Sequence, residues 1–162
     1  GTYPVFSYLQ NDALLSGIEA FFDWSVNPFF NYQFQGNSIL AWNVDISDYL
    51  PLFPADRYSH GFTFKPQSNI SLVKNSSVQF LYKQIFKQHR TPKIGDLAHP
   101  PPSYALFDLV ISKEIIHKKT STTINFKVEN LFNNAYRDYL DRLRYFSDRP
   151  GINLILECLI KL

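Results

Sequence analysis

The sequence predicts an all-β fold, an antiparallel meander of about seven strands that cross a membrane. Three observations predict it. Apolar and polar residues alternate with a period of two over most of the chain. Two of these segments, 28–43 and 121–135, exceed the usual length of a soluble strand, about five or six residues. The connections between segments alternate between short and long, as in outer-membrane barrels, which have short turns on one side and long loops on the other.

The composition narrows the class of protein. Of 162 residues, 17% are aromatic and 19% are charged. The net charge is +2, and the basic residues are scattered along the chain. We therefore expect no nucleic-acid partner. The single cysteine, Cys158, excludes an intrachain disulfide framework. No apolar run predicts a transmembrane helix, and the first residues do not resemble a signal peptide. Methionine is absent even at position 1, so we expect a processed product or a piece of a longer protein.

The first two segments place their apolar side chains at even positions. Residues 5–24 form the first, a short break follows at 25–28, and residues 29–43 form the second. Their apolar positions are Phe6, Tyr8, Leu14, Ile18, Ala20, Phe22, Trp24, Phe30, Tyr32, Phe34, Leu40 and Trp42. Residues 44–57, with two prolines, are predicted to form a long loop.

Five further segments also alternate apolar and polar residues. They are 58–65, 76–88, 104–117, 121–135 and 152–162. Short connections are expected at 66–75 and 118–121, and long loops at 88–103 and 136–151. The predicted apolar face carries Tyr58, His60, Phe62, Phe64, Val78, Phe80, Tyr82, Phe86, Ala105, Phe107, Leu109, Ile111, Ile115, Ile124, Phe126, Val128, Ile152, Leu154, Leu156, Cys158, Ile160 and Leu162.

Alternation alone also fits a soluble sheet, but two further features favour a membrane. The polar face is rich in Gln, Asn, Lys and Glu, which suit a wet lumen better than a dry core. Aromatic residues flank the connections and are expected to form belts at the two bilayer interfaces. The expected belt residues are Trp24, Phe29 and Phe30 beside a short connection, and Trp42, Tyr58 and Tyr104 beside long loops.

Three motifs resemble the C-terminal part of TonB-dependent outer-membrane receptors. "VENLFNNAYRDYL" followed by "PGINLILECLIKL" resembles the closing strands of that family. "YLQNDALLSGIEAFF" looks like an earlier strand, and "YLPLFPADR" is similar to its Leu-Pro-x-x-Pro-x-x-Arg segment. The motifs occur in family order and span nearly the whole chain. Two positions depart from the pattern: Leu162 replaces the usual final Phe, and Ile152 replaces the usual Arg after Pro-Gly.

The resemblance implies that residues 1–162 are one partial domain, the C-terminal segment of a receptor barrel of about 22 strands. Neither the plug domain nor a TonB box is recognisable. A final strand running inward would place the loops at 44–57, 88–103 and 136–151 outside the cell.

The resemblance also implies a transporter rather than an enzyme, located in the outer membrane of a Gram-negative bacterium. Its expected role is receptor-mediated uptake of a siderophore-like metal chelate, as in iron transport, or of a similar nutrient. The implied partners are outer-membrane lipid, the rest of the barrel and plug, TonB through the plug, and the small-molecule chelate. No cofactor is expected.

The sequence predicts no catalytic centre and no metal site. The four histidines match no ligand spacing, and no nucleophile motif is present. In residues 136–151, aspartates interleave with arginines. Two interpretations stay open: contacts to an anionic chelate through arginine charge, or a solvated, salt-bridged loop. The ligand-contact candidates are Arg142, Arg144 and Tyr145.

Two alternative functions also stay open. A stand-alone eight-stranded outer-membrane barrel with an adhesive or structural role fits the length but needs one more strand and a closed sheet. A soluble β-sandwich binding module would be expressed without detergent as a compact monomer.

Overall fold

One antiparallel sheet dominates the computed structural model, which describes residues 10–94, 96, 98–118 and 120–161. Its strands are β1 (Ala13–Asn27), β2 (Phe30–Asn43), β3 (Asp48–Tyr49), β4 (Arg57–Phe64), β5 (Ser76–Ile85), β6 (Tyr104–His117), β7 (Thr120–Glu129) and β8 (Asn153–Lys161), and a 3-10 turn, η1 (Arg142–Tyr145), precedes β8. No helix in these described ranges has the length and apolar character needed to cross a bilayer.

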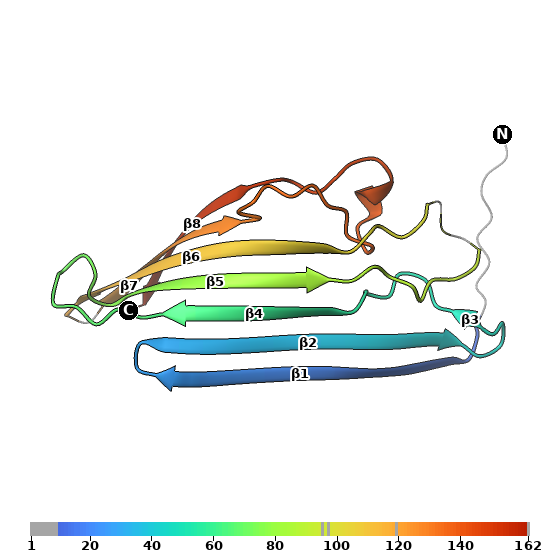
Figure 1. The fold of residues 1–162 in the computed structure, drawn as a ribbon, viewed down its shortest axis with the longest axis horizontal. Coiled ribbons are helices and arrows are strands. Elements are labelled where there is room, and N and C mark those ends of the chain that lie inside the picture. The colour runs from blue at the N-terminus through green and yellow to red at the C-terminus, as the bar shows by residue number, and fades with distance from the viewer. Residues whose placement is uncertain (1–9, 95, 97, 119, 162) are drawn as a thin grey trace.

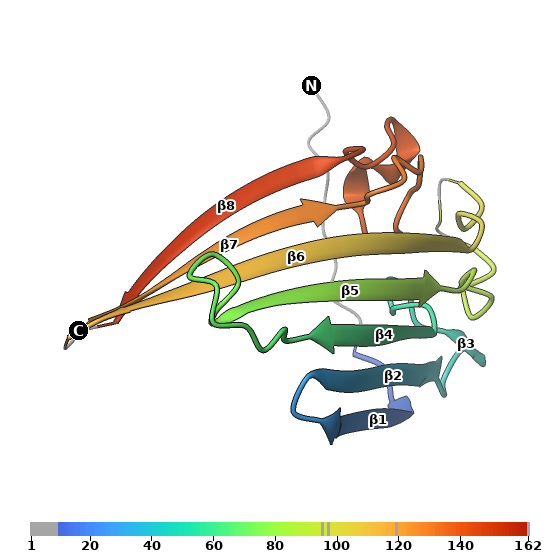
Figure 2. The same ribbon diagram turned by 60° about the vertical axis from the view of Figure 1, so that its left-hand side comes forward.

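The sheet is a meander, as predicted. Its order is β1-β2-β4-β5-β6-β7-β8, and the two-residue β3 pairs with β2. The seven long strands lie side by side in chain order (Figure 1). β1 and β8 form the two edges, so the described sheet is open, and it curves as a barrel wall does (Figure 2).

Short and long connections lie at opposite ends of the sheet (Figure 1). One end carries the turns at 28–29, 65–75 and 118–119, and the other carries the loops at 44–56, 86–103 and 130–152. The turn after β1 is set by Asn27, whose side chain accepts a hydrogen bond from the Phe29 amide at 2.9 Å, next to Pro28. The connection at 65–75 is longer than a hairpin turn, so the alternation of lengths is less strict than the sequence suggested.

Backbone register confirms the alternating faces. Across the sheet, Phe22 pairs with Phe34, Phe34 with His60, and His60 with Tyr82. The row continues through Phe107 on β6. Because paired residues of an antiparallel sheet point to the same side, the predicted apolar positions of β1, β2 and β4 to β8 lie on one face.

Three details differ from the sequence predictions. The segment expected at 121–135 ends as a strand at Glu129, because Asn130 adopts a φ of 52° and turns the chain. β3 and η1 were not expected within the long loops. Tyr104 lies on the inner face, opposite Ile85, and not with the outer aromatic belt. The expected contributions of Phe6, Tyr8 and Leu162 lie outside the described residues.

Candidate functional site

The face of the sheet that carries the predicted apolar positions, the outer face, is an uncovered apolar surface. Ile18 on β1, Phe80 on β5 and Leu156 on β8 are 73%, 54% and 73% exposed. Sheet contacts in the described part of the chain join only neighbouring strands, with no second layer over this face. An apolar surface this wide is far larger than a soluble monomer usually leaves in water, whereas it is what a strand facing lipid requires.

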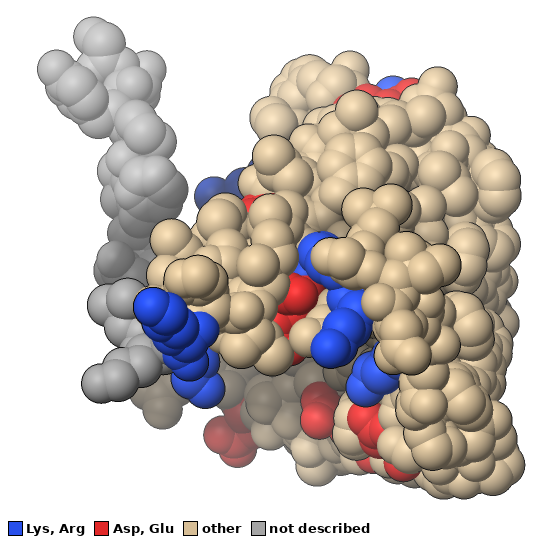
Figure 3. All heavy atoms as spheres, turned by 90° about the vertical axis from the view of Figure 1, so that its left-hand side faces the viewer, with Lys and Arg blue, Asp and Glu red and all other residues tan. Residues whose placement is uncertain are grey.

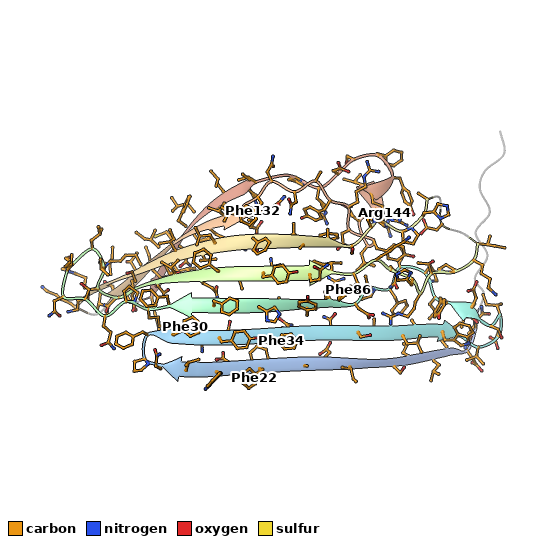
Figure 4. All side chains as sticks on the ribbon, in the orientation of Figure 1. Phe22, Phe30, Phe34, Phe86, Phe132 and Arg144 are labelled. Atoms are coloured by element: carbon orange, nitrogen blue, oxygen red, sulfur yellow. The ribbon has the colours of Figure 1, made fainter. Side chains whose placement is uncertain are left out.

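Aromatic rings run across the outer face in an unbroken series. Tyr32 lies 6.2 Å from Phe22 and 5.3 Å from Phe62, measured between ring centroids, and Tyr82 lies 5.0 Å from Phe107. The Tyr32 hydroxyl and His60 Nδ1 are 2.8 Å apart, so the one histidine in this series has a hydrogen-bond partner. Figure 4 shows Phe22, Phe30 and Phe34 along β1 and β2.

The inner face is polar and internally paired. Lys83 Nζ lies 2.5 Å from Asp108 Oδ2, and Lys127 Nζ lies 2.6 Å from Glu129 Oε1. The Asn153 side chain also donates to Glu129, at 3.1 Å. Viewed from the end with the short turns, acidic and basic side chains gather in a hollow, while the flank beside it is almost uncharged (Figure 3). Such a division suits a sheet with lipid on one side and water on the other.

The first two long loops are tied together by polar contacts. Gln88, which is 2% exposed, donates to the carbonyls of Phe53 and Pro54 at 3.0 and 2.8 Å. Arg90 forms an ion pair with Asp56. Since Gln88 and Arg90 belong to the second loop and their partners to the first, the two loops have a fixed relative position.

The second and third long loops meet at Arg144. Its NH2 group lies 2.6 Å from both carboxylate oxygens of Asp96, and its guanidinium lies 4.6 Å above the ring of Tyr139 and 4.5 Å above that of Tyr145. The Tyr145 hydroxyl donates to Asp96 at 2.8 Å. Partial burial on its own raises the pKa of Asp96, but the hydrogen bonds from Arg144 and Tyr145 outweigh it and hold that pKa below its usual value.

The three predicted ligand-contact residues therefore differ in their surroundings. The Arg144 side chain (Figure 4) is only 2% exposed and is paired with Asp96, which also accepts a hydrogen bond from Tyr145, so Arg144 and Tyr145 join two loops. Arg142 is exposed at the surface of the third loop.

Within the third loop, the interleaved charges form the salt bridges that one interpretation expected. Arg137 pairs with Asp148 at 2.5 Å, and Arg149 pairs with Asp141 at 2.8 Å. Asp138 accepts a hydrogen bond from the Tyr104 hydroxyl at 2.7 Å, which fastens the loop to the start of β6.

Sequence reasoning missed Asp96, Tyr139 and Gln88. Asp96 and Tyr139 lie in segments predicted as loops, and Gln88 lies where the segment expected at 76–88 meets a loop. No local pattern links Asp96 to an arginine 48 residues away. For Asn130, by contrast, the sequence did contain a signal, the Asn-Leu-Phe-Asn motif. The backbone amide of Asn130 donates to the buried Asp108 at 3.0 Å. The Asn130 side chain donates to the backbone carbonyl of Asn134 and accepts from its backbone amide.

No group of three or more His, Cys, Asp or Glu side chains in the described ranges is arranged to hold a metal ion. Cys158 is exposed and pairs in register with Ile124, on the outer face as predicted.

Comparison with known proteins gives a structural likeness only. The chain matches no family model and no curated protein. It is similar to a solved structure described as the copper transporter OprC, with 16% sequence identity and a TM-score of 0.74. The similarity covers 89% of this chain and 22% of that one, so the chain spans about a fifth of the matched protein. At this identity the likeness shows the fold alone, and the matched protein is a transporter and not an enzyme.

Proposed function

We propose that this chain is the C-terminal barrel segment of a TonB-dependent transporter in the outer membrane of a Gram-negative bacterium. The observation that carries the proposal is that one open sheet has an apolar outer face and a charged inner face. The outer face exposes Phe80, Phe126 and Leu156, whereas the inner face carries paired charges such as Lys83 and Asp108. Lipid on one side and water on the other satisfies both faces.

The open edges support a larger barrel. β1 is 15 residues long, and among the described strands it pairs with β2 alone. An unpaired strand in a bilayer leaves backbone amides and carbonyls without partners, at a cost of several kcal/mol for each group. We therefore expect further strands of the same barrel to pair with β1 and β8. The likeness to about a fifth of a transporter fits this arrangement.

The proposed activity is uptake of a scarce small molecule. In this assignment the chain supplies wall strands and three external loops, while a plug domain and TonB supply gating and energy. We propose a metal chelate of the siderophore type, or a similar nutrient, as the substrate, and Arg142, Arg144 and Tyr145 as loop residues near its entry. Iron is one candidate metal.

The test is insertion of the complete protein that contains this chain. Residues 130–162 are deleted, and folded protein in the outer membrane is measured by protease protection and heat-modifiable gel mobility. The deletion removes β8 and the motif that ends β7, so we expect assembly to fail. Undiminished insertion would contradict the role given to the closing strands. A gene in which a start codon directly precedes Gly1 would contradict the receptor assignment.

The open sheet also bears on the two alternatives. A stand-alone eight-stranded barrel requires β1 to pair with β8, and in the described residues each is an edge. A soluble sandwich requires a second sheet over the outer face, and contacts in the described ranges join only strands of the one sheet.

A further inference from the structure

We propose that the inner face beneath the external loops binds a small carboxylate or oxyanion group through Arg57. The inference rests on the proposed function, because it assumes that this face lines the lumen through which a substrate passes. It adds the chemical class of the group recognised and the wall residue that recognises it.

Arg57 lies on the inner face of the sheet. It opens β4 and pairs in register with Asn37 on β2 and Ile85 on β5, both on the inner face. It is the arginine of the segment "YLPLFPADR", in which Pro51 and Pro54 restrict the approach to the strand. The sequence singled out this segment, but the sheet alone gives its arginine no role.

Among the described residues, the charge of Arg57 has no ion-pair partner. Its Nε makes one long contact, 3.4 Å, to the carbonyl of Ala55. In the part of the chain that the structure describes, no carboxylate lies within ion-pair distance of its guanidinium. The other arginines differ: Arg90, Arg137, Arg144 and Arg149 are ion-paired, and Arg142 is exposed.

A hollow of about 220 Å³ lies beside Arg57. Polar and apolar groups both line it: Tyr58 and Ile85 border it, and its polar side chains come from Gln35, Asn37, Ser59, Lys83, Tyr104 and Asp138. Asp138 also borders the hollow, where its two carboxylate oxygens accept hydrogen bonds from the Tyr104 hydroxyl and the Leu140 amide, and among the described residues it forms no ion pair with Arg57. Lys83 also borders the hollow, and its ammonium group is paired with Asp108.

These groups define the ligand. A guanidinium fork binds a carboxylate or phosphate through two parallel hydrogen bonds, and the amides of Gln35 and Asn37 add neutral donors. The hollow is smaller than the pockets that enclose drug-sized molecules, about 300–1,000 Å³. It therefore suits a small polycarboxylate, or one acidic arm of a larger chelate.

The test uses the complete protein, purified in detergent and titrated by calorimetry with citrate and, separately, with inorganic phosphate. We expect Arg57→Gln to weaken binding at least about tenfold, since a hydrogen bond to a charged group is lost. Arg57→Lys keeps the charge without the fork, so an intermediate affinity is expected. Lys93→Gln, which removes one positive charge from an exposed position of the second loop, is the matched control and should leave the affinity unchanged.

Folding and binding are scored separately. Each variant is first checked for membrane insertion by protease protection, which tests the proposed function and not the site. A correctly inserted protein that binds neither anion would overturn the site, as would an Arg57→Gln variant with unchanged affinity. Equal losses in Arg57→Gln and Lys93→Gln would also overturn it, because they indicate unspecific surface charge.

Discussion

Phe80 offers a direct test of which side of the sheet faces lipid. It lies near the middle of β5, a strand of ten residues, and pairs with Phe62 on one side and Leu109 on the other. At about 3.4 Å per residue the strand is about 34 Å long, and a tilt of about 40° leaves about 26 Å along the bilayer normal, close to the apolar band of about 25 Å. Phe80 is therefore placed near the bilayer midplane.

A lysine at that depth is costly. We expect Phe80→Lys to lower the free energy of unfolding by about 2–4 kcal/mol, the cost of a lipid-facing lysine at the midplane. Gln79→Lys is the matched control, because residue 79 is adjacent on the same strand and faces the lumen, so its effect should stay within about 0.5 kcal/mol. Phe80→Leu keeps the position apolar and should cost less than Phe80→Lys.

The assay is urea unfolding of the complete protein in lipid vesicles, followed by tryptophan fluorescence and heat-modifiable gel mobility. Phe80 is already 54% exposed, so a surface in contact with water would tolerate lysine there. Equal midpoints for Phe80→Lys and Gln79→Lys would refute the assignment of the outer face to lipid.

Three further predictions concern the third loop and its attachment to the sheet. Gly151→Ala places a Cβ 2.1 Å from the side-chain oxygen of Asn133, so that side chain must move and give up the hydrogen bond it accepts from the Ile152 amide, at a cost of about 1 kcal/mol in urea unfolding. The effect should shrink on an Asn133→Gly background, where the backbone φ of 54° suits glycine. The pKa of Asp96 is lowered in the folded protein, so the stability that its pairing with Arg144 supplies is complete above the unfolded pKa of about 3.9 and is lost as the pH falls through the folded pKa. On acidification, the protease resistance of the loops should decline more steeply in the wild type than in Asp96→Asn. Equal slopes would show that Asp96 is not the cause. Asp108→Leu leaves the buried amide of Asn130 unpaired and should cost about 1–3 kcal/mol in the same unfolding assay, whereas Asp108→Asn keeps an acceptor and should cost less; equal costs would show that the Asn130 bond contributes nothing.

The faces of the strands could be predicted because they follow from local pattern. The period of two assigns each side chain to one side of a strand, so Phe22, Phe62 and Phe126 were placed correctly without any tertiary information. Tyr104 was misplaced because its aromatic character and its position beside a loop were used in place of its register. Opposite Ile85, it lies on the inner face.

The end of β7 could be predicted only in part. The strand was expected to run to residue 135, but it ends at Glu129, where Asn130 turns the chain and its backbone amide donates to Asp108. Asparagine tolerates a positive φ better than most residues, so the motif held a signal for a turn. Its partner on β6, 22 residues earlier in the chain, could not be read from that signal.

The sequence by itself determined the meander, the two faces and the ends at which long loops lie, because each depends on the spacing of residues within one segment. Only the tertiary structure decided which charges are used. Arg144 was a candidate for an anionic ligand, and the fold pairs it with Asp96 from another loop. Arg57 carried no such expectation, and among the described residues it has no ion-pair partner and borders a hollow. The physical reason is that an ion pair depends on distances across the sheet and between loops, which the order of residues along one strand does not encode.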